Sequence, residues 1–350
     1  MRHPQSRAFI YAAAGALLFG LSTPFSKLLV ARADPLLLAA VYYLSGALFI
    51  MFFPGAASVL DVAAWIRRDR VFLAGSALLG GVIAPVLMLS GLRLVDAASA
   101  SLLFSLEVPF TAMLAALLFR EHISRRVFIA AVLAMVSGAL LGFEGSGLRL
   151  NLGALLVAAS CLCWGLDNNL VARIEGVNPQ ASTVVKGAAA GTFNLLLWFF
   201  LREGAVFPPI SVLSGAVLVG CLGYGLSTML YVVSARGIGA ARSQVIFSAN
   251  PFIGAAASLA VFGLGIATSR QTFAAAGMVA ALILIYSERH EHSHCHEALE
   301  HEHSHSHDDG HHAHEHPAFA PSAAHSHRHS HQALEHSHGH FPDLHHMHGH

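Results

Sequence analysis

An acidic residue, Glu107, lies near the centre of the apolar stretch between Ala97 and Glu121. A helix of about 20 apolar residues is long enough to cross a bilayer. A carboxylate at mid-membrane costs on the order of 3 kcal/mol even on lenient scales, so such a group usually faces a cavity. Pro109 follows and removes a helical hydrogen bond. Glu107 is therefore a candidate for binding a cation or a proton. The alternative is a protonated side chain that is hydrogen-bonded to a neighbouring helix.

A second apolar stretch, Gly239 to Gly265, repeats this arrangement with Asn250 directly before Pro251. We expect Asn250 to lie near the midplane of the membrane, where it is a second candidate for the substrate or proton pathway. An amide at that depth also suits a structural hydrogen bond between helices. Both interpretations of Asn250 stay open.

Three consecutive polar residues, Asp167, Asn168 and Asn169, occur inside a further apolar stretch. Together they cover most of a helix circumference, so at least one of them must face the protein interior. Asp167 and Asn168 are therefore candidates for a gate or an entry ligand. Lys186 is expected at a similar depth in the next helix. The alternative is an ion pair between Asp167 and Lys186, because buried charges are normally paired.

Two cysteines of the same stretch, Cys161 and Cys163, are expected to pack as small apolar residues. Residues two apart on a helix are separated by about 200° around its axis, so a regular helix does not direct both thiols to one ion.

Histidines are concentrated at the end of the chain, where residues 288–350 hold 23 of the 25. Most follow a His-x-His pattern, in which alternate residues project to the same side of an extended chain. Imidazole suits nickel, cobalt, copper and zinc. The candidate metal ligands are His290, His292, His294, Cys295, His296, His301, His303, His305, His307, His311, His312, His314, His316, His325, His327, His329, His331, His336, His338 and His340.

This tail is of low complexity and has no apolar period, so we expect it to be disordered without a ligand. Binding of divalent metal, such as nickel, cobalt or zinc, is the predicted role. A polycation that charges below about pH 6.5 and an idle low-complexity segment are the alternatives. No cofactor is expected to be required by the rest of the chain.

The composition predicts a membrane protein with many spans. Only 11% of the 350 residues are charged, about half the share in a soluble protein, and the mean hydropathy is +0.59. Continuous apolar runs exclude the alternating pattern of a membrane barrel. The ten expected helical spans are Ala8–Ala31, Leu36–Phe53, Val71–Leu92, Ala97–Phe119, Val127–Phe143, Asn151–Ala172, Ala181–Leu201, Val212–Ala235, Ala240–Leu264 and Thr272–Ser287.

The short loops carry more arginine on one side than on the other, which predicts that both termini are cytoplasmic. Parts of the two halves also align: Phe19-Gly20-Leu21 with Trp164-Gly165-Leu166, and Pro109 with Pro251. Five spans per half place the second copy upside down. Inverted repeats are typical of secondary transporters, whose substrates bind near the midplane. The predicted fold is thus an all-α polytopic membrane protein of ten transmembrane helices in two inverted five-helix repeats.

The sequence resembles the drug/metabolite transporter superfamily, specifically the EamA-type permeases. The resemblance rests on Phe19-Gly20, Trp164-Gly165, Asp34-Pro35, and Pro109 with Arg120-Glu121-His122. It implies two EamA-like repeats, at residues 8–143 and 151–287, followed by the cytoplasmic histidine-rich tail at 288–350. Lys186 stands where the family often has a basic residue. Glu107 has no counterpart in the family pattern.

The resemblance implies a transporter of the inner membrane rather than an enzyme. Members of the superfamily with histidine-rich tails have been linked to nickel and cobalt resistance, which implies proton-coupled export of a divalent metal here. The alternative is an exporter of small organic metabolites, amino acids or drugs, whose tail is regulatory. The expected partners are the lipid bilayer and the substrate; a homodimer is allowed, and no nucleic acid is expected.

Overall fold

The computed structural model describes residues 4–53, 67–119, 125–144, 149–171, 173–174, 179–202, 206–238, 243, 246–263, 268–286, 290–296, 299–305, 325–331 and 334–340. The chain divides into two compact units. The first contains Met1–Glu288 together with Leu344–His350, and the second contains Arg289–Asp343.

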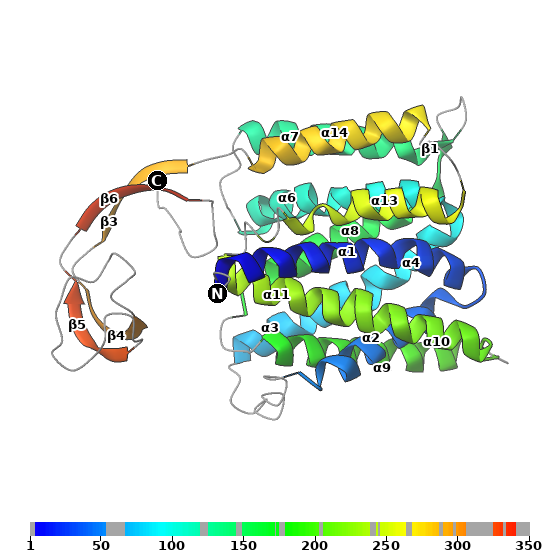
Figure 1. The fold of residues 1–350 in the computed structure, drawn as a ribbon, viewed down its shortest axis with the longest axis horizontal. Helices are drawn as coiled ribbons and strands as arrows, with labels where there is room; N and C mark the ends of the chain where they lie inside the picture. The colour runs from blue at the N-terminus through cyan, green and yellow to red at the C-terminus, as the bar shows by residue number, and fades with distance from the viewer. Residues whose placement is uncertain are drawn as a thin grey trace. The chain divides into compact units, whose positions relative to one another are not determined.

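The first unit is a helical bundle (Figure 1). Its first-half elements are α1 (Pro4–Val30), α2 (Pro35–Ile50), α3 (Arg67–Ser76), the π-helix η2 (Ala77–Ile83), α4 (Ala84–Leu94), α5 (Ala97–Leu103), the 3₁₀ turn η3 (Phe104–Leu106), α6 (Glu107–Phe119), α7 (Arg125–Gly142) and β1 (Phe143–Glu144). The elements that follow are β2 (Arg149–Leu150), α8 (Leu152–Val171), α9 (Pro179–Leu201), α10 (Ile210–Val219), the π-helix η4 (Gly220–Leu226), α11 (Ser227–Ile238), α13 (Asn250–Val261) and α14 (Ser269–Tyr286).

Six helical stretches among the described residues are long and apolar enough to cross a membrane: Arg7–Val30, Asp69–Leu94, Ala97–Leu118, Leu152–Val171, Gln180–Leu201 and Ile210–Tyr231. Four further apolar helices are shorter: Pro35–Ile50, Phe128–Leu141, Asn250–Val261 and Ser269–Leu284. The prediction of a multi-pass helical membrane protein is therefore supported, while the count of ten spans stays a prediction.

Three of the expected spans contain a π-helical or 3₁₀ segment within them. The expected span at Val71–Leu92 contains η2, the span at Ala97–Phe119 contains η3, and the span at Val212–Ala235 contains η4. Glycines occur within both π-helices, and a π-helical turn often marks a functional site. The interruption at η3 ends directly before Glu107.

The packing of the bundle shows a pattern that is shared by its two halves. Helix α1 packs on α11 and α13, and α8 packs on α4 and α6. Helix α2 packs on α9, α5 on α13, and α7 on α14. The halves correspond as α1 with α8, α2 with α9, α4 with α11, α5 and α6 together with α13, and α7 with α14. Exchanging each of these for its counterpart leaves the set of contacts unchanged. The two π-helices correspond in the same way, because η2 packs on α8 and α9 whereas η4 packs on α1 and α2.

Close approach of helices requires small residues at the contacts. A Cβ added to Gly187 would lie 2.9 Å from the Cβ of Ala47, and one added to Gly191 would lie 2.8 Å from the backbone nitrogen of Leu44. This spacing is the close helix-packing face that a small-xxx-small pattern provides in membranes. These two glycines therefore allow α9 to pack closely against α2.

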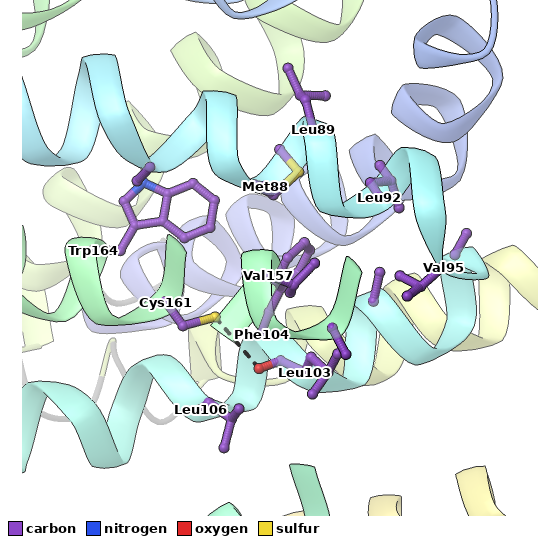
Figure 2. Packing of buried hydrophobic residues seen from close by; sticks show 14 of the residues in the cluster. Met88, Leu89, Leu92, Val95, Leu103, Phe104, Leu106, Val157, Cys161 and Trp164 are labelled. Carbon is purple, nitrogen blue, oxygen red and sulfur yellow. Dashed lines mark hydrogen bonds between the residues drawn. The ribbon is translucent and has the colours of Figure 1, made fainter. Parts of the chain in front are cut away.

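The largest buried apolar cluster joins α4, α5 and α8 (Figure 2). Met88 and Leu92 of α4 lie beside Val157 of α8 there. The Cys161 thiol donates to the backbone oxygen of Leu103 at 3.5 Å. Cys161 is fully buried, which agrees with its expected packing role. This cluster fixes α8, the helix that carries Asp167 and Asn168.

The second unit differs from the disorder expected for the tail. Its described residues form β3 (His290–His296), β4 (Leu299–His305), β5 (His325–His331) and β6 (Leu334–His340). Strand β3 pairs antiparallel with β6, and β4 pairs antiparallel with β5. The physical reason lies in the His-x-His alternation, whose period of two is also the period of a strand. The expectation of disorder rested on the low apolar content, whereas the His-x-His period already indicated an extended chain.

Candidate substrate cavity

A cavity of about 280 Å³ lies within the helical unit and brings together most of the candidate residues. Glu107, Asp167, Asn168 and Lys186 all line it. The walls come from α1, α2, α6, α8, α9, η4 and α11. The cavity extends from Glu107, at the interruption of its span, to Val171 at the end of α8. The end of α8 and the start of α9 therefore border one side of the cavity.

An ion pair between Lys186 and Asp167 joins α9 to α8 inside the cavity. The Asp167 side chain is 7% exposed and the Lys186 side chain 18% exposed. The hydroxyl of Ser76, in α3, donates to the other carboxylate oxygen of Asp167. Both oxygens of this buried acid are thus satisfied, as a buried charge requires. Of the two roles considered for Asp167, the structure contains the ion pair.

Glu107 is held differently, by an amide rather than by a cation. The side-chain nitrogen of Asn168 donates to Glu107 Oε1 at 2.8 Å. The hydroxyl of Thr111, one turn along α6, donates to the backbone oxygen of Glu107 at 2.8 Å. No cation pairs with Glu107 among the described residues. Glu107 is therefore the acid of this cavity that can take up a proton or a positively charged ligand.

The π-helix η2 forms part of the support for this cavity. The backbone oxygen of Gly80 accepts hydrogen bonds from the Tyr43 hydroxyl at 2.6 Å and from the Trp164 indole nitrogen at 3.2 Å. A Cβ added to Gly80 would overlap the Asp167 carboxylate. Glycine is therefore required here by the close approach of backbone and carboxylate. The carbonyl of Gly80 also orients these two aromatic side chains of the cavity.

Aromatic rings form much of the remaining wall. Tyr224 lies with its ring centroid 5.1 Å from that of Tyr42, 5.5 Å from that of Tyr43 and 5.9 Å from that of Phe19. Trp164, Tyr231 and Phe247 also line the cavity. The buried hydroxyl of Tyr224 has no hydrogen-bond partner among the described residues. A polar atom of a bound ligand can satisfy it.

Asn250, the remaining pathway candidate, does not line this cavity. Its side-chain nitrogen donates to the backbone oxygen of Phe247 at 2.8 Å. Asn250 begins α13 after a turn at Ser248 and Ala249. This contact is local to the segment and is not the hydrogen bond between helices that was the alternative for Asn250. The continuous helix expected over Ala240–Leu264 is thus interrupted at the proline-preceding residues.

The histidine-rich candidates belong to the second unit. The strands place His292 opposite His338 and His303 opposite His327 in their registers. His307, His311, His312, His314 and His316 lie outside the described residues. No group of three or more metal-binding side chains occurs among the residues whose side chains the structure describes.

The side chain of Lys27, in α1, forms hydrogen bonds at the end of α4. The Lys27 ammonium group donates to the backbone oxygens of Leu92 and Val95 at 2.6 Å each and of Arg93 at 3.2 Å. These are carbonyls at the end of α4, where helices leave acceptors unpaired. Lys27 thereby joins α1 to α4.

Comparison with known proteins agrees with this architecture. Residues 6–143 match the EamA-like transporter family. This EamA-like region contains α1 to α7, including Glu107 and Tyr43. A protein of Methanothermobacter thermautotrophicus described as an uncharacterized transporter is 28% identical over 263 residues, which cover 71% of this chain and 77% of the relative. Both matches are to transporters, which favours transport over catalysis.

A solved crystal structure of a protein is similar in fold to this chain. The TM-score is 0.56 at 20% sequence identity, and the match covers 80% of this chain and 96% of that chain. At this identity the similarity concerns the fold alone. The Arg120-Glu121-His122 motif, which contributed to the expected EamA resemblance, lies outside the described residues.

Sequence reasoning missed the aromatic wall and the role of Gly80. The aromatic residues come from five labelled elements and, in the case of Phe247, from the segment before α13, and nothing in their spacing along the chain brings them together. The adjacent glycines Gly80 and Gly81 inside an apolar span were an available signal, because glycine in a helix marks close backbone approach.

Proposed function

We propose that this chain is a secondary transporter whose substrate binds in the aromatic cavity, with Glu107 as the exchangeable acid. The observation that carries the proposal is the contrast between the two acids of the cavity. Asp167 is bound to Lys186, whereas Glu107 accepts only the Asn168 amide among the described residues. Charged groups within membrane proteins mark substrate and ion pathways.

The substrate class that this cavity fits best is a small organic cation. Asp167 and Lys186 cancel one another, so Glu107 supplies the net negative charge. Aromatic faces attract ammonium groups by about 0.5–2 kcal/mol each. A volume of about 280 Å³ is close to the lower limit of ordinary ligand pockets. A protonated or quaternary amine with a short apolar part meets all three conditions.

Transport follows from competition at Glu107. The carboxyl group holds either a proton or the cationic substrate, and the Asn168 amide keeps it oriented toward the cavity. The cation is released on the outer side, where a proton replaces it on the carboxyl group. The proton is then released on the inner side, where the next cation binds, and this exchange couples substrate export to the proton gradient. We propose that the protein lies in the inner membrane with both termini cytoplasmic, on the basis of the arginine distribution.

Export of nickel or cobalt is a second candidate, and the histidine-rich tail is the observation that favours it. The tail is proposed to bind divalent metal and to raise its concentration at the membrane. The cavity supports this candidate less well, because the Lys186 ammonium repels a divalent cation and the described cavity offers only two carboxylates. The tail can also bind metal as a regulator of an organic-cation transporter.

A comparison of two solutes tests which substrate class is correct. Cells that express the full chain are loaded with either radioactive nickel or benzyltrimethylammonium, a permanent aromatic cation, and retention is followed over time. We expect faster loss of benzyltrimethylammonium than in cells expressing Glu107→Gln, with nickel retention equal in the two strains. Faster loss of nickel alone, dependent on Glu107, would replace the organic-cation proposal with metal export.

A further inference from the structure

A second hollow lies in the helical unit, at the ends of α4 and α9 and the connection between α1 and α2. Its volume is about 420 Å³. Arg32 comes from the connection, Arg93 from α4, and Arg202 directly follows α9. Asp34 is the acid that lines it, and Trp198 contributes an apolar surface. Three arginines therefore converge on one hollow with a single carboxylate.

The Asp34 carboxylate already accepts two hydrogen bonds. Asp34 Oδ2 accepts from Arg202 at 2.7 Å, and Asp34 Oδ1 accepts from the backbone nitrogen of Leu36 at 2.9 Å. The second contact caps the start of α2. Arg32 and Arg93 have no side-chain hydrogen bond or ion pair with the described residues. Two guanidinium groups that border the hollow are thus available for an anion.

Exposed apolar residues continue from this hollow along the end of α9 and the start of α10. Phe200 is 81% exposed, Val206 86% and Ile210 80%. Trp198 is buried and stacks on Phe207, with ring centroids 5.0 Å apart. Aromatic residues at the end of a membrane span are typical of the headgroup level of a bilayer. A basic hollow beside exposed apolar side chains offers sites for both parts of an amphipathic anion.

We propose that this hollow binds a phosphate group, with Arg32 and Arg93 as its two principal ligands and Arg202 as the third. Guanidinium and phosphate form parallel charge-assisted hydrogen bonds, which makes arginine the suitable residue for this recognition. The position at the end of α9 and the adjoining apolar surface favour the headgroup of an acidic phospholipid as the source of the phosphate. A soluble phosphate ester has the same headgroup chemistry without the acyl chains.

The test is binding to the purified full chain in neutral detergent, with native mass spectrometry as the readout. The probes are phosphatidylglycerol, phosphatidylcholine and glycerol phosphate. The test variant is Arg32→Gln with Arg93→Gln. The matched control is Arg125→Gln with Arg126→Gln, which removes two exposed arginines from α7. Melting temperatures of all three proteins establish that each is folded.

We expect the wild type and the control to bind phosphatidylglycerol equally. We expect the test variant to bind it at least roughly tenfold more weakly, because it loses charge-assisted hydrogen bonds to the phosphate and each loss of about 1.4 kcal/mol corresponds to a factor of ten. Binding of phosphatidylglycerol without glycerol phosphate identifies a lipid site, and binding of both identifies a general phosphate site. Equal binding by the test variant and the wild type, equal weakening by both variants, equal binding of phosphatidylcholine, or no binding of any probe would overturn the proposal.

Discussion

The ion pair between Asp167 and Lys186 permits a double-mutant cycle with a definite expected sign. Lys186→Met removes the cation and leaves Asp167, which is 5% exposed as a residue, with only the Ser76 hydroxyl as a side-chain donor. Removing one partner of a buried pair costs about 3–5 kcal/mol, whereas removing both charges is often nearly neutral. The Lys186 side chain keeps 18% exposure to the cavity, so we expect a cost near the lower limit of that range.

The assay is thermal unfolding of the purified protein in detergent at pH 7. A cost of about 3 kcal/mol lowers the melting temperature by about 6 °C if each kcal/mol corresponds to about 2 °C in a chain of this size. The double variant Asp167→Asn with Lys186→Met restores most of this loss, because the uncompensated carboxylate is gone. Reasoning from the ion pair is refuted if Lys186→Met melts like the wild type, or if the double variant melts no higher than Lys186→Met.

Two further substitutions test the surroundings of the cavity. Gly80→Ala places a methyl group against the Asp167 carboxylate, so we expect a loss of about 1–3 kcal/mol in stability. The control is Gly75→Ala, whose added Cβ meets only the end of the Leu170 side chain. We expect this control to leave the melting temperature nearly unchanged. Lys27→Met removes the donor from the three carbonyls at the end of α4 and lowers stability by about 1–3 kcal/mol in the same assay; an unchanged melting temperature would show that these contacts contribute nothing.

The helical membrane architecture could be predicted from composition and from the lengths of the apolar runs. The expected span at Asn151–Ala172, for example, corresponds to α8 at Leu152–Val171. The interruptions could not be predicted from hydropathy, because η2, η3 and η4 contain no charged residue that would mark a break. A π turn depends on which carbonyl is taken up by a neighbour, as Gly80 is by Tyr43 and Trp164.

The candidate site was partly predictable for a similar reason. Charged residues in apolar spans stand out, so Glu107, Asp167 and Lys186 were found, and all three line one cavity. Apolar aromatic residues do not stand out in an apolar sequence, so Phe19 and Tyr224 were missed. For the tail, the alternation indicated an extended chain, and at β3 and β5 it has the period of a strand, but the low apolar content led us to expect disorder instead.

The most direct test of the account is transport of benzyltrimethylammonium into proteoliposomes that contain the purified full chain and have an acidic interior. Three proteins are compared: wild type, Glu107→Asp and Glu107→Gln. We expect accumulation by the wild type that collapses when the pH gradient is removed, and reduced accumulation by Glu107→Asp. We expect at least a roughly tenfold loss in Glu107→Gln, which can neither bind a cation by charge nor exchange a proton. Gradient-driven accumulation by a folded Glu107→Gln protein at the wild-type rate would contradict it.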